Sequence, residues 1–309
     1  PSLLLTAGLH FQHYSLNNSA ALEPRFGLQY TIGSRQSVGI GYGLHSQAQN
    51  VYTYFVQTPT PRGPVLTNRD LGFTRSHHLV LTYQNQLSRH LSLKIEPYYQ
   101  AIFDAPVERH PSAFSVLNTG SSFGPSDADS LVNQGTGRNL GIEFTLERSF
   151  NRGYYFLVTT SLFDSKYKGS DGVERNTSFN TGYVFNVLVG KEIKVGRKQT
   201  NVFSFNLKAS SIGGRYVSPL DPERSRARGV AVYDENRAYS QQLDSYFRAD
   251  LRLSYRKEYR RSTLEAAIDL QNVTGRQNVF QQTYNRRLNR LTTEYQQGFF
   301  PVPQLRYTF

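Results

Sequence analysis

The chain has 309 residues, a net charge of +12, 13% aromatic residues, and no cysteine, methionine or tryptophan. The lack of cysteine excludes a disulfide framework, a thiolate metal site and a cysteine nucleophile. No stretch approaches the roughly 18 consecutive apolar residues of a membrane helix. No signal peptide is recognisable at Pro1, and the chain opens inside a strand-like segment, so we expect further sequence upstream.

Apolar and polar residues alternate with a period of two along almost the whole chain, which predicts β-strands rather than helices. In HHLVLTYQNQL (77–87), for example, Leu79, Leu81 and Tyr83 share one face, while Thr82 and Gln84 share the other. Counting such segments predicts twelve strands, near residues 2–16, 23–32, 37–48, 77–87, 91–103, 138–150, 153–166, 182–195, 200–214, 245–258, 262–273 and 299–309.

The predicted strands run about 10 to 15 residues, against a usual 5 to 6 in soluble sheets. One face of each is apolar, and the other carries full charges at mid-strand. A transmembrane barrel needs this pattern, because lipid lies outside it and water inside. The alternative is a soluble all-β sandwich with insertions.

The predicted connections alternate in length, which favours the barrel, because outer-membrane barrels have short turns on one rim and long loops on the other. The short turns are GSRQ (33–36), SRH (88–90), NRG (151–153), GRKQ (196–199) and YRRS (259–262). The long polar segments are 48–76, 104–136, 167–181, 215–244 and 274–298.

The turn at 259–262 predicts a register for the hairpin around it. Arg256 falls opposite Glu265, and Arg252 falls opposite Asp269, all on the polar face. Opposite charges across antiparallel strands stabilise a sheet by a few tenths of a kcal/mol to about 1 kcal/mol. A slip of one residue would turn these charges toward lipid, at about 2 to 4 kcal/mol for each arginine near the midplane.

The chain resembles the carboxy-terminal part of the barrel of TonB-dependent outer-membrane receptors, of the type with a carboxypeptidase-regulatory-like amino-terminal module. The likeness is carried by LSLKIEPYYQAIFDAPVE (91–108), by the long stretch from NQGTGRNLGIEFTLE to VFNVLVGKE (133–192), by AAIDLQNVTGRQNV (266–279) and by the terminal PQLRYTF. It spans most of the chain from about residue 70 onward.

The resemblance implies a 22-stranded transmembrane antiparallel β-barrel with long extracellular loops and short periplasmic turns, of which residues 1–309 form a carboxy-terminal segment. It implies a plug and further strands outside this sequence, so the chain is expected to be a fragment or a split gene product. The implied partners are a TonB-type energy-coupling protein, the barrel-assembly machinery, outer-membrane lipid and lipopolysaccharide, and an unknown nutrient or a surface lipoprotein. The assembly signal would be Leu305, Tyr307 and Phe309.

Several motifs resemble part of a metal-binding or phosphate-binding site but lack residues or elements that such a site needs. HFQH (10–13) and His77–His78 have no nearby carboxylate cluster for a metal, so we interpret them as polar rim residues. Asp127 and Asp129 have the spacing that opens a calcium loop, yet Leu131 occupies the next ligand position. The glycines of GIGYG (39–43) and IGGR (212–215) precede no helix, which excludes a phosphate loop and favours bending or close backbone approach.

We therefore expect an import receptor without covalent chemistry and without a cofactor or metal. No compact basic face with stacking aromatics indicates nucleic acid. The alternatives are a self-closed twelve-stranded barrel, acting as a hydrolase or an autotransporter pore, and an adhesin. The residues expected to face the lumen or plug are Lys94, Glu96, Arg248, Asp250, Arg252, Arg256, Glu265, Asp269 and Arg306. The loop aromatics expected to bind ligand are Tyr52, Tyr54, Phe55, Tyr233 and Tyr239, with packing inside the loops as the alternative.

Overall fold

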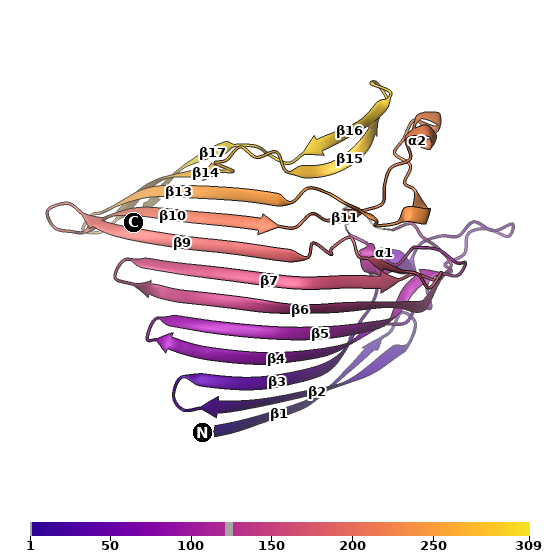
Figure 1. Cartoon of the computed structure of the whole chain (residues 1–309), viewed down its shortest axis with the longest axis horizontal. Helices are drawn as coiled ribbons and strands as arrows, with labels where there is room; N and C mark the ends of the chain where they lie inside the picture. Colours follow the sequence, from indigo (N-terminus) through magenta and orange to yellow (C-terminus); the bar gives the residue numbers. More distant parts are fainter. Residues whose placement is uncertain (1, 121–125) are drawn as a thin grey trace.

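Twelve long strands form one antiparallel sheet in this computed structural model, which describes residues 2–120 and 126–309 (Figure 1). A short thirteenth strand, β8 (Glu174–Asn176), adds to β7. In sheet order the twelve strands are β1 (Ser2–Tyr14), β2 (Ser19–Ile32), β3 (Gln36–Gln47), β4 (Thr74–Ser88), β5 (Leu91–Glu108), β6 (Leu131–Asn151), β7 (Tyr154–Lys168), β9 (Tyr183–Val195), β10 (Asn201–Ile212), β13 (Tyr246–Glu258), β14 (Thr263–Gln271) and β17 (Phe300–Thr308).

The predicted strands are confirmed, and β5 and β6 are longer than the alternation indicated. The two strands continue to pair past irregularities around Ala105, so that Val107 lies opposite Val132. Asp104 has a φ of 57° in this stretch. Because the extra strand residues are irregular in phase, the period-two pattern misses them, and the predicted loop 104–136 shortens to 109–130.

The long loops contain short regular elements that the sequence pattern did not reveal. These are α1 (Val51–Tyr54), η1 (Val116–Asn118), α2 (Pro222–Arg228), η2 (Glu235–Arg237), the pair β11 (Tyr216–Val217) and β12 (Gln241–Gln242), and the hairpin β15 (Val279–Asn285) and β16 (Arg290–Tyr295). Helix α2 has a complete set of local signals: Asp221 caps it by accepting from the Arg224 N–H at 2.9 Å, Pro222 begins it, and Gly229 ends it with a φ of 65°. In the described residues no helix combines the length and the apolar character required to cross a membrane.

The two ends of the sheet differ in their connections (Figure 1). At the turn end, all five predicted short turns are confirmed, as residues 33–35, 89–90, 152–153, 196–200 and 259–262. At the loop end, the strands are joined by the long segments, apart from the short connection 15–18 between β1 and β2.

The sheet is open, with β1 and β17 at opposite ends of the strand order. A self-closed twelve-stranded barrel predicted that the first strand pairs with residues 299–309. Pro1 itself lies outside the described residues, but β1 pairs with β2 and β17 pairs with β14. The first and last strands are therefore not neighbours in this structure, which contradicts the self-closed twelve-stranded barrel.

One face of the sheet is apolar and exposed. Leu81 in the middle of β4 is 47% exposed, and Leu140 in β6 is 51% exposed. The buried apolar cluster is instead small and lies at the loop end, where Tyr54 packs with Leu71 and Leu131. A soluble sandwich would bury the apolar face of its strands, so this distribution contradicts the sandwich alternative.

The opposite face is polar, and the predicted hairpin register is confirmed there. Arg252 lies opposite Asp269 and Arg256 lies opposite Glu265. The Arg252 guanidinium contacts Asp269 at 2.9 Å and Glu265 at 3.0 Å. Arg256 reaches Glu258 at 3.5 Å, within its own strand, so the cross-strand carboxylate of Glu265 is held by Arg252 instead.

Close backbone approach accounts for the glycines of IGGR (212–215). A Cβ atom at Gly213 would lie 1.8 Å from the Thr181 carbonyl oxygen, and one at Gly214 would lie 1.6 Å from that of Leu243. Only glycine allows the chain to leave β10 this close to its neighbours. The motif predicted as a close-approach site is thus confirmed as one, and it anchors the loop that carries β11 and α2.

Candidate ligand site at the loop end

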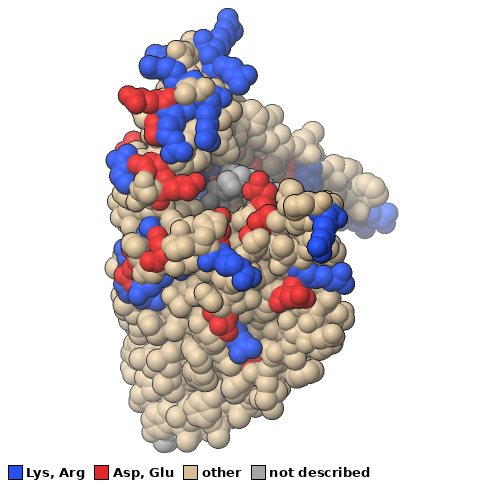
Figure 2. Space-filling model, turned by 90° about the vertical axis from the view of Figure 1, so that its right-hand side faces the viewer, with Lys and Arg blue, Asp and Glu red and all other residues tan. Residues whose placement is uncertain are grey.

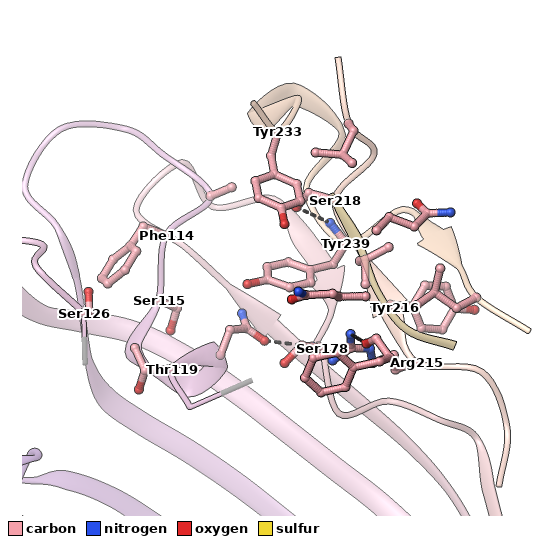
Figure 3. A pocket seen from close by; sticks show the side chains of 18 of the residues that line it. Phe114, Ser115, Thr119, Ser126, Ser178, Arg215, Tyr216, Ser218, Tyr233 and Tyr239 are labelled. Atoms are coloured by element: carbon pink, nitrogen blue, oxygen red, sulfur yellow. Dashed lines mark hydrogen bonds between the residues drawn. The ribbon is translucent and has the colours of Figure 1, made fainter. Parts of the chain in front are cut away.

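The loop end contains a cavity of about 400 Å³ between segments that are far apart in the sequence (Figure 3). Phe114 and Thr119 reach it from the loop 109–130, and Ser178 reaches it from the segment after β8. The loop 213–245 supplies the largest part of the wall, including Tyr233 and Tyr239. The site therefore depends on three loops and on the β15–β16 hairpin, whose first strand closes one side with Phe280, Gln281 and Gln282.

Tyr239 is the aromatic residue with the most constrained position in this wall. Its backbone has a φ of 51°, and its N–H donates to Ser218 Oγ at 3.2 Å. Its ring meets the ring of Tyr167 edge-on, with centroids 5.9 Å apart. Burial raises the pKa of the Tyr239 hydroxyl, so this group is a neutral donor and acceptor at physiological pH.

The polar groups of the cavity are mostly hydroxyls and amides. Asn118 Oδ1 accepts from the Ser178 N–H at 2.8 Å, which joins η1 to the segment after β8. The Arg215 guanidinium donates to the carbonyl oxygen of Phe280, which joins the loop 213–245 to β15. Among the lining residues that the structure describes, Arg215 is the one permanent cation and Asp127 the one carboxylate. The lining is thus close to neutral and rich in aromatic rings.

The sequence-predicted ligand residues separate into two groups. Tyr233 and Tyr239 line the cavity, whereas Tyr52, Tyr54 and Phe55 belong to α1 and the residue after it, away from the cavity. Tyr54 is buried in the small core and its hydroxyl accepts from the Gln49 N–H at 3.1 Å, and burial raises its pKa. Tyr52 and Phe55 are exposed. A ligand-binding role for all five remains a prediction.

The sequence reasoning missed Phe114, Arg215, Tyr216 and Phe280. Each lies in a long loop or where a loop joins a strand, which is a usable signal for binding residues. The missing information is which loops meet. That depends on tertiary hydrogen bonds such as the one between Asn118 and Ser178.

The predicted lumen-facing charges lie on the polar face in two separate groups, one on β5 and one on β13, β14 and β17. All except Arg306 form ion pairs among the described residues. Lys94 contacts Glu96 at 2.6 Å, and Arg248 contacts Asp250 at 2.7 Å. Arg306 lies opposite Glu265 in the register between β14 and β17. Contact of any of these side chains with a plug remains a prediction.

Toward the loop end, the polar face carries a chain of hydrogen bonds across neighbouring strands. Asn139 Nδ2 donates to Gln100 Oε1 at 2.8 Å, and its Oδ1 accepts from Ser165 Oγ at 2.6 Å. Thr177 Oγ1 then donates to Ser165 Oγ at 2.9 Å. This stretch of the polar face is therefore built from amides and hydroxyls, like the cavity beside it.

A second polar group on this face is centred on a buried carboxylate, Glu23. It accepts from Gln12 Nε2 and the Ser46 N–H at 2.8 Å and from Arg25 at 3.0 Å, and it contacts His10 Nδ1 at 3.0 Å. Four partners leave no free lone pair pointing to a ligand, so we interpret Glu23 as a structural link between β1, β2 and β3.

Histidine and carboxylate clusters give no metal site in the described residues, which hold no group of three or more such side chains with suitable placement. The His45 and His78 rings lie 4.5 Å apart, and Tyr42 bonds His77 at 2.9 Å. The predicted assembly signal lies on β17 and just after it, with Leu305 76% exposed and Phe309 97% exposed on either side of exposed Tyr307.

Lys and Arg side chains gather at one point of the loop end, over α2 and the β15–β16 hairpin at the top of Figure 2. Elsewhere on this end Asp and Glu are interspersed with them (Figure 2). Arg286 Nε donates to the Gly229 carbonyl oxygen at 3.3 Å, which holds the hairpin against the end of α2.

Comparison with known proteins gives a family and a fold. The model of the family described as "TonB dependent receptor-like, beta-barrel" matches residues 1–273. No curated protein matches the chain by sequence. Among solved structures, the chain is similar to the ferric-catecholate import receptor Fiu from E. coli K12, with a TM-score of 0.61 and 14% identity over 94% of this chain and 36% of that one.

Two further solved structures match the chain with similar TM-scores and similar sequence identity. The ferric yersiniabactin uptake receptor FyuA from Yersinia pestis matches with a TM-score of 0.62 and 12% identity, over 94% of this chain and 38% of that one. The outer membrane transporter YddB from Escherichia coli matches with a TM-score of 0.62 and 13% identity, over 98% of this chain and 43% of that one. The chain thus spans less than half the length of each of these structures.

Proposed function

This chain belongs to the family of TonB-dependent receptor-like β-barrels of the outer membrane, and we propose that it forms the carboxy-terminal part of a receptor that imports an extracellular nutrient. In this proposal the loop end faces outward and binds the nutrient. A plug in the lumen then opens the path with energy from a TonB-type partner.

The observation that carries the proposal is the open sheet with one exposed apolar face and one charged face. Unpaired N–H and C=O groups along β1 and β17 would each cost several kcal/mol in hydrocarbon. Strands from outside residues 1–309 would pair with both edges and complete the wall. A barrel of that size has a lumen wide enough to need a plug, which fits the charged and hydrogen-bonded polar face.

The ligand would first meet the loop-end cavity. Its aromatic rings supply contact area at low entropic cost, and its hydroxyls and amides supply orientation. The uncharged chain through Gln100, Asn139 and Ser165 would continue the path down the polar face.

Energised import is tested by solute depletion from the growth medium. Cells with the complete receptor, cells without it, and cells with it after addition of a protonophore are compared by mass spectrometry of the medium. We expect at least one solute to disappear only with the receptor and only with an intact proton gradient. Receptor-dependent uptake that survives the protonophore would instead indicate a passive pore, and cell attachment without uptake would indicate an adhesin.

A matched pair of variants ties import to the cavity. Tyr239→Ala removes a partly buried ring from the wall, and Tyr52→Ala removes an exposed loop ring away from it. The proposal predicts that the first variant raises the half-saturating solute concentration at least about tenfold, as expected for loss of one aromatic anchor, and that the second leaves it unchanged. Equal effects of the two variants would place the binding site elsewhere.

A further inference from the structure

Each of the five short turns carries an arginine, and none of the five contains an acidic residue. The arginines are Arg35, Arg89, Arg152, Arg197 and Arg260. All five are exposed, and Lys198 and Arg261 add a second cation to the last two turns. None of these side chains forms an ion pair among the described residues, whereas arginines inside the sheet, such as Arg248 and Arg252, are paired.

Turn chemistry alone does not explain the arginine at position 152. The two-residue turn 152–153 has a positive φ at both positions, 53° at Arg152 and 78° at Gly153. Asparagine or aspartate before glycine is the favoured choice for this turn, because a larger side chain with positive φ is strained. Arg152 has this strained backbone conformation although a smaller residue would fit the turn better. This indicates that its side chain has a role outside the turn.

Three more cations lie on the apolar face just inside the same end of the sheet. Arg148 and Lys191 lie on either side of the Tyr154 ring, at 4.2 and 5.3 Å from its centroid, and Lys257 lies 5.0 Å from the centroid of Tyr259. In the register of the sheet, Arg148 and Lys191 continue the row of apolar residues that includes Leu146 and Val189. Arg148 Nε has no hydrogen-bond acceptor among the described residues.

We propose that this turn-end cation belt, formed by the five turn arginines with Arg148, Lys191 and Lys257, binds the phosphate groups of anionic phospholipids in the periplasmic leaflet. This proposal rests on the location of the family's barrels in the outer membrane. It does not depend on which nutrient is imported or on the energy-coupling partner. Aromatic rings sit at headgroup level in membrane proteins, and long cationic side chains reach from there toward phosphates. Arginine suits this partner because its planar fork bonds two phosphate oxygens at once.

The position of the belt selects lipid over a protein partner. It continues directly from the exposed apolar face, so its cations lie where that face meets water. Adjacent hairpins of a sheet are about 10 Å apart, since each strand adds about 4.8 Å. The cations of the belt are therefore spaced along a row and can each contact a different lipid headgroup. The belt has no apolar centre of the kind that a protein interface needs.

The test uses the complete receptor reconstituted in phosphatidylcholine vesicles, with spin-labelled phosphatidylglycerol and spin-labelled phosphatidylcholine as probes. The turn variant is R35Q/R89Q/R152Q/R197Q/R260Q. The control is R224Q/R226Q/R228Q/R287Q/R290Q, which removes five exposed arginines from the loop end. Because all ten positions lie outside the twelve long strands, we expect both variants to assemble, which heat-modifiable electrophoretic mobility checks.

The wild-type receptor and the control are expected to prefer phosphatidylglycerol by roughly fivefold, as one cation near a membrane surface provides. The turn variant, which keeps Arg148, Lys191 and Lys257, is expected to show a clearly smaller preference than the wild type. Retained preference in the turn variant, equal loss in the control, or no preference in the wild type would each overturn the proposal. The conservative variant R148K/R152K, which keeps both charges, is expected to retain most of the preference, and complete loss in it would show that cationic charge at these positions does not carry the binding.

Discussion

The turn end and the loop end of this sheet are held in place by different kinds of interaction. At the turn end, a few residues close each hairpin, and the geometry is set by local backbone requirements such as the positive φ angles of Gly33 and Gly153. At the loop end, long segments are held by contacts between residues far apart in the sequence, such as Asn68 with Ala128 and Asn118 with Ser178. Substitutions at the turn end should therefore act locally, and those at the loop end should act on several segments at once.

The largest effect is expected at Gly214, where the loop 213–245 leaves the sheet. Gly214→Val would place side-chain atoms against the Leu243 carbonyl oxygen, already 1.6 Å from an ideal Cβ, and should lower the free energy of unfolding by about 3 to 5 kcal/mol. Gly153→Ala at the turn end has a φ of 78° and a Cβ contact of 2.7 Å, and should cost about 1 to 3 kcal/mol. Thermal unfolding of the complete receptor in detergent measures both. Gly8→Ala, with open space around it, is the control, and similar losses at all three sites would remove the distinction.

The next largest effect is expected from arginine substitutions in the long strands, which run between the two ends. Leu81→Arg on the apolar face should lower the free energy of unfolding in lipid vesicles by about 2 to 4 kcal/mol. Thr82→Arg, on the adjacent polar face, should cost less than about 1 kcal/mol, because Glu96 lies within reach of that position. Urea titration of the reconstituted receptor measures the two values. An equal cost for both variants would mean that the faces do not differ in their surroundings.

Asn68 tests how the loop end is held together. It is fully buried, donates to the carbonyl oxygens of Thr53 and Ala128, and accepts from the Leu131 N–H. Asn68→Ala leaves those groups without partners and should cost about 2 to 3 kcal/mol. Hydrogen exchange should speed up in the segments around Thr53 and Leu131 together while the five turns keep their wild-type rates. Faster exchange confined to residues next to Asn68 in sequence would show that the loops are independent of one another.

The smallest effect is a pH dependence at the loop after β7. The Arg175 guanidinium, which bonds Asp171 at 2.6 Å, lowers the pKa of that carboxyl below its ordinary 3.8. Because the folded-state pKa is the lower one, this pair stabilises the loop above about pH 4 and is lost as the pH falls through the folded-state value. The effect is about 1 kcal/mol or less, since the pair is partly solvated. In the wild type, hydrogen exchange of the Val173 amide should accelerate below pH 4 beyond the intrinsic pH effect, and Asp171→Asn should abolish that excess.

The sequence predicted the sheet well because its determinants are local. The alternation around Leu81 and Thr82 assigns the faces, and the turn 259–262 fixes the pairing of Arg252 with Asp269. The cavity was only partly predicted, through Tyr233 and Tyr239. Its other residues are brought together by contacts across the loops, such as that between Arg215 and Phe280, and no period in the sequence encodes which loops meet. The β15–β16 hairpin was missed for a related reason, since polar residues such as Gln281, Gln282 and Thr283 give it no apolar stripe.

The most direct measurement uses a spin probe attached at one of two adjacent positions of β4 in the complete receptor. Residues 1–309 contain no native cysteine, so within them the probe attaches only at the introduced cysteine. Leu81→Cys and Thr82→Cys are labelled separately in lipid vesicles, and their collision rates with oxygen and with a water-soluble nickel chelate are compared. A label at position 81 should collide mainly with oxygen, which concentrates in hydrocarbon, and a label at position 82 should not. Preferential collision of label 81 with the nickel chelate would place water against the apolar face and contradict the membrane assignment.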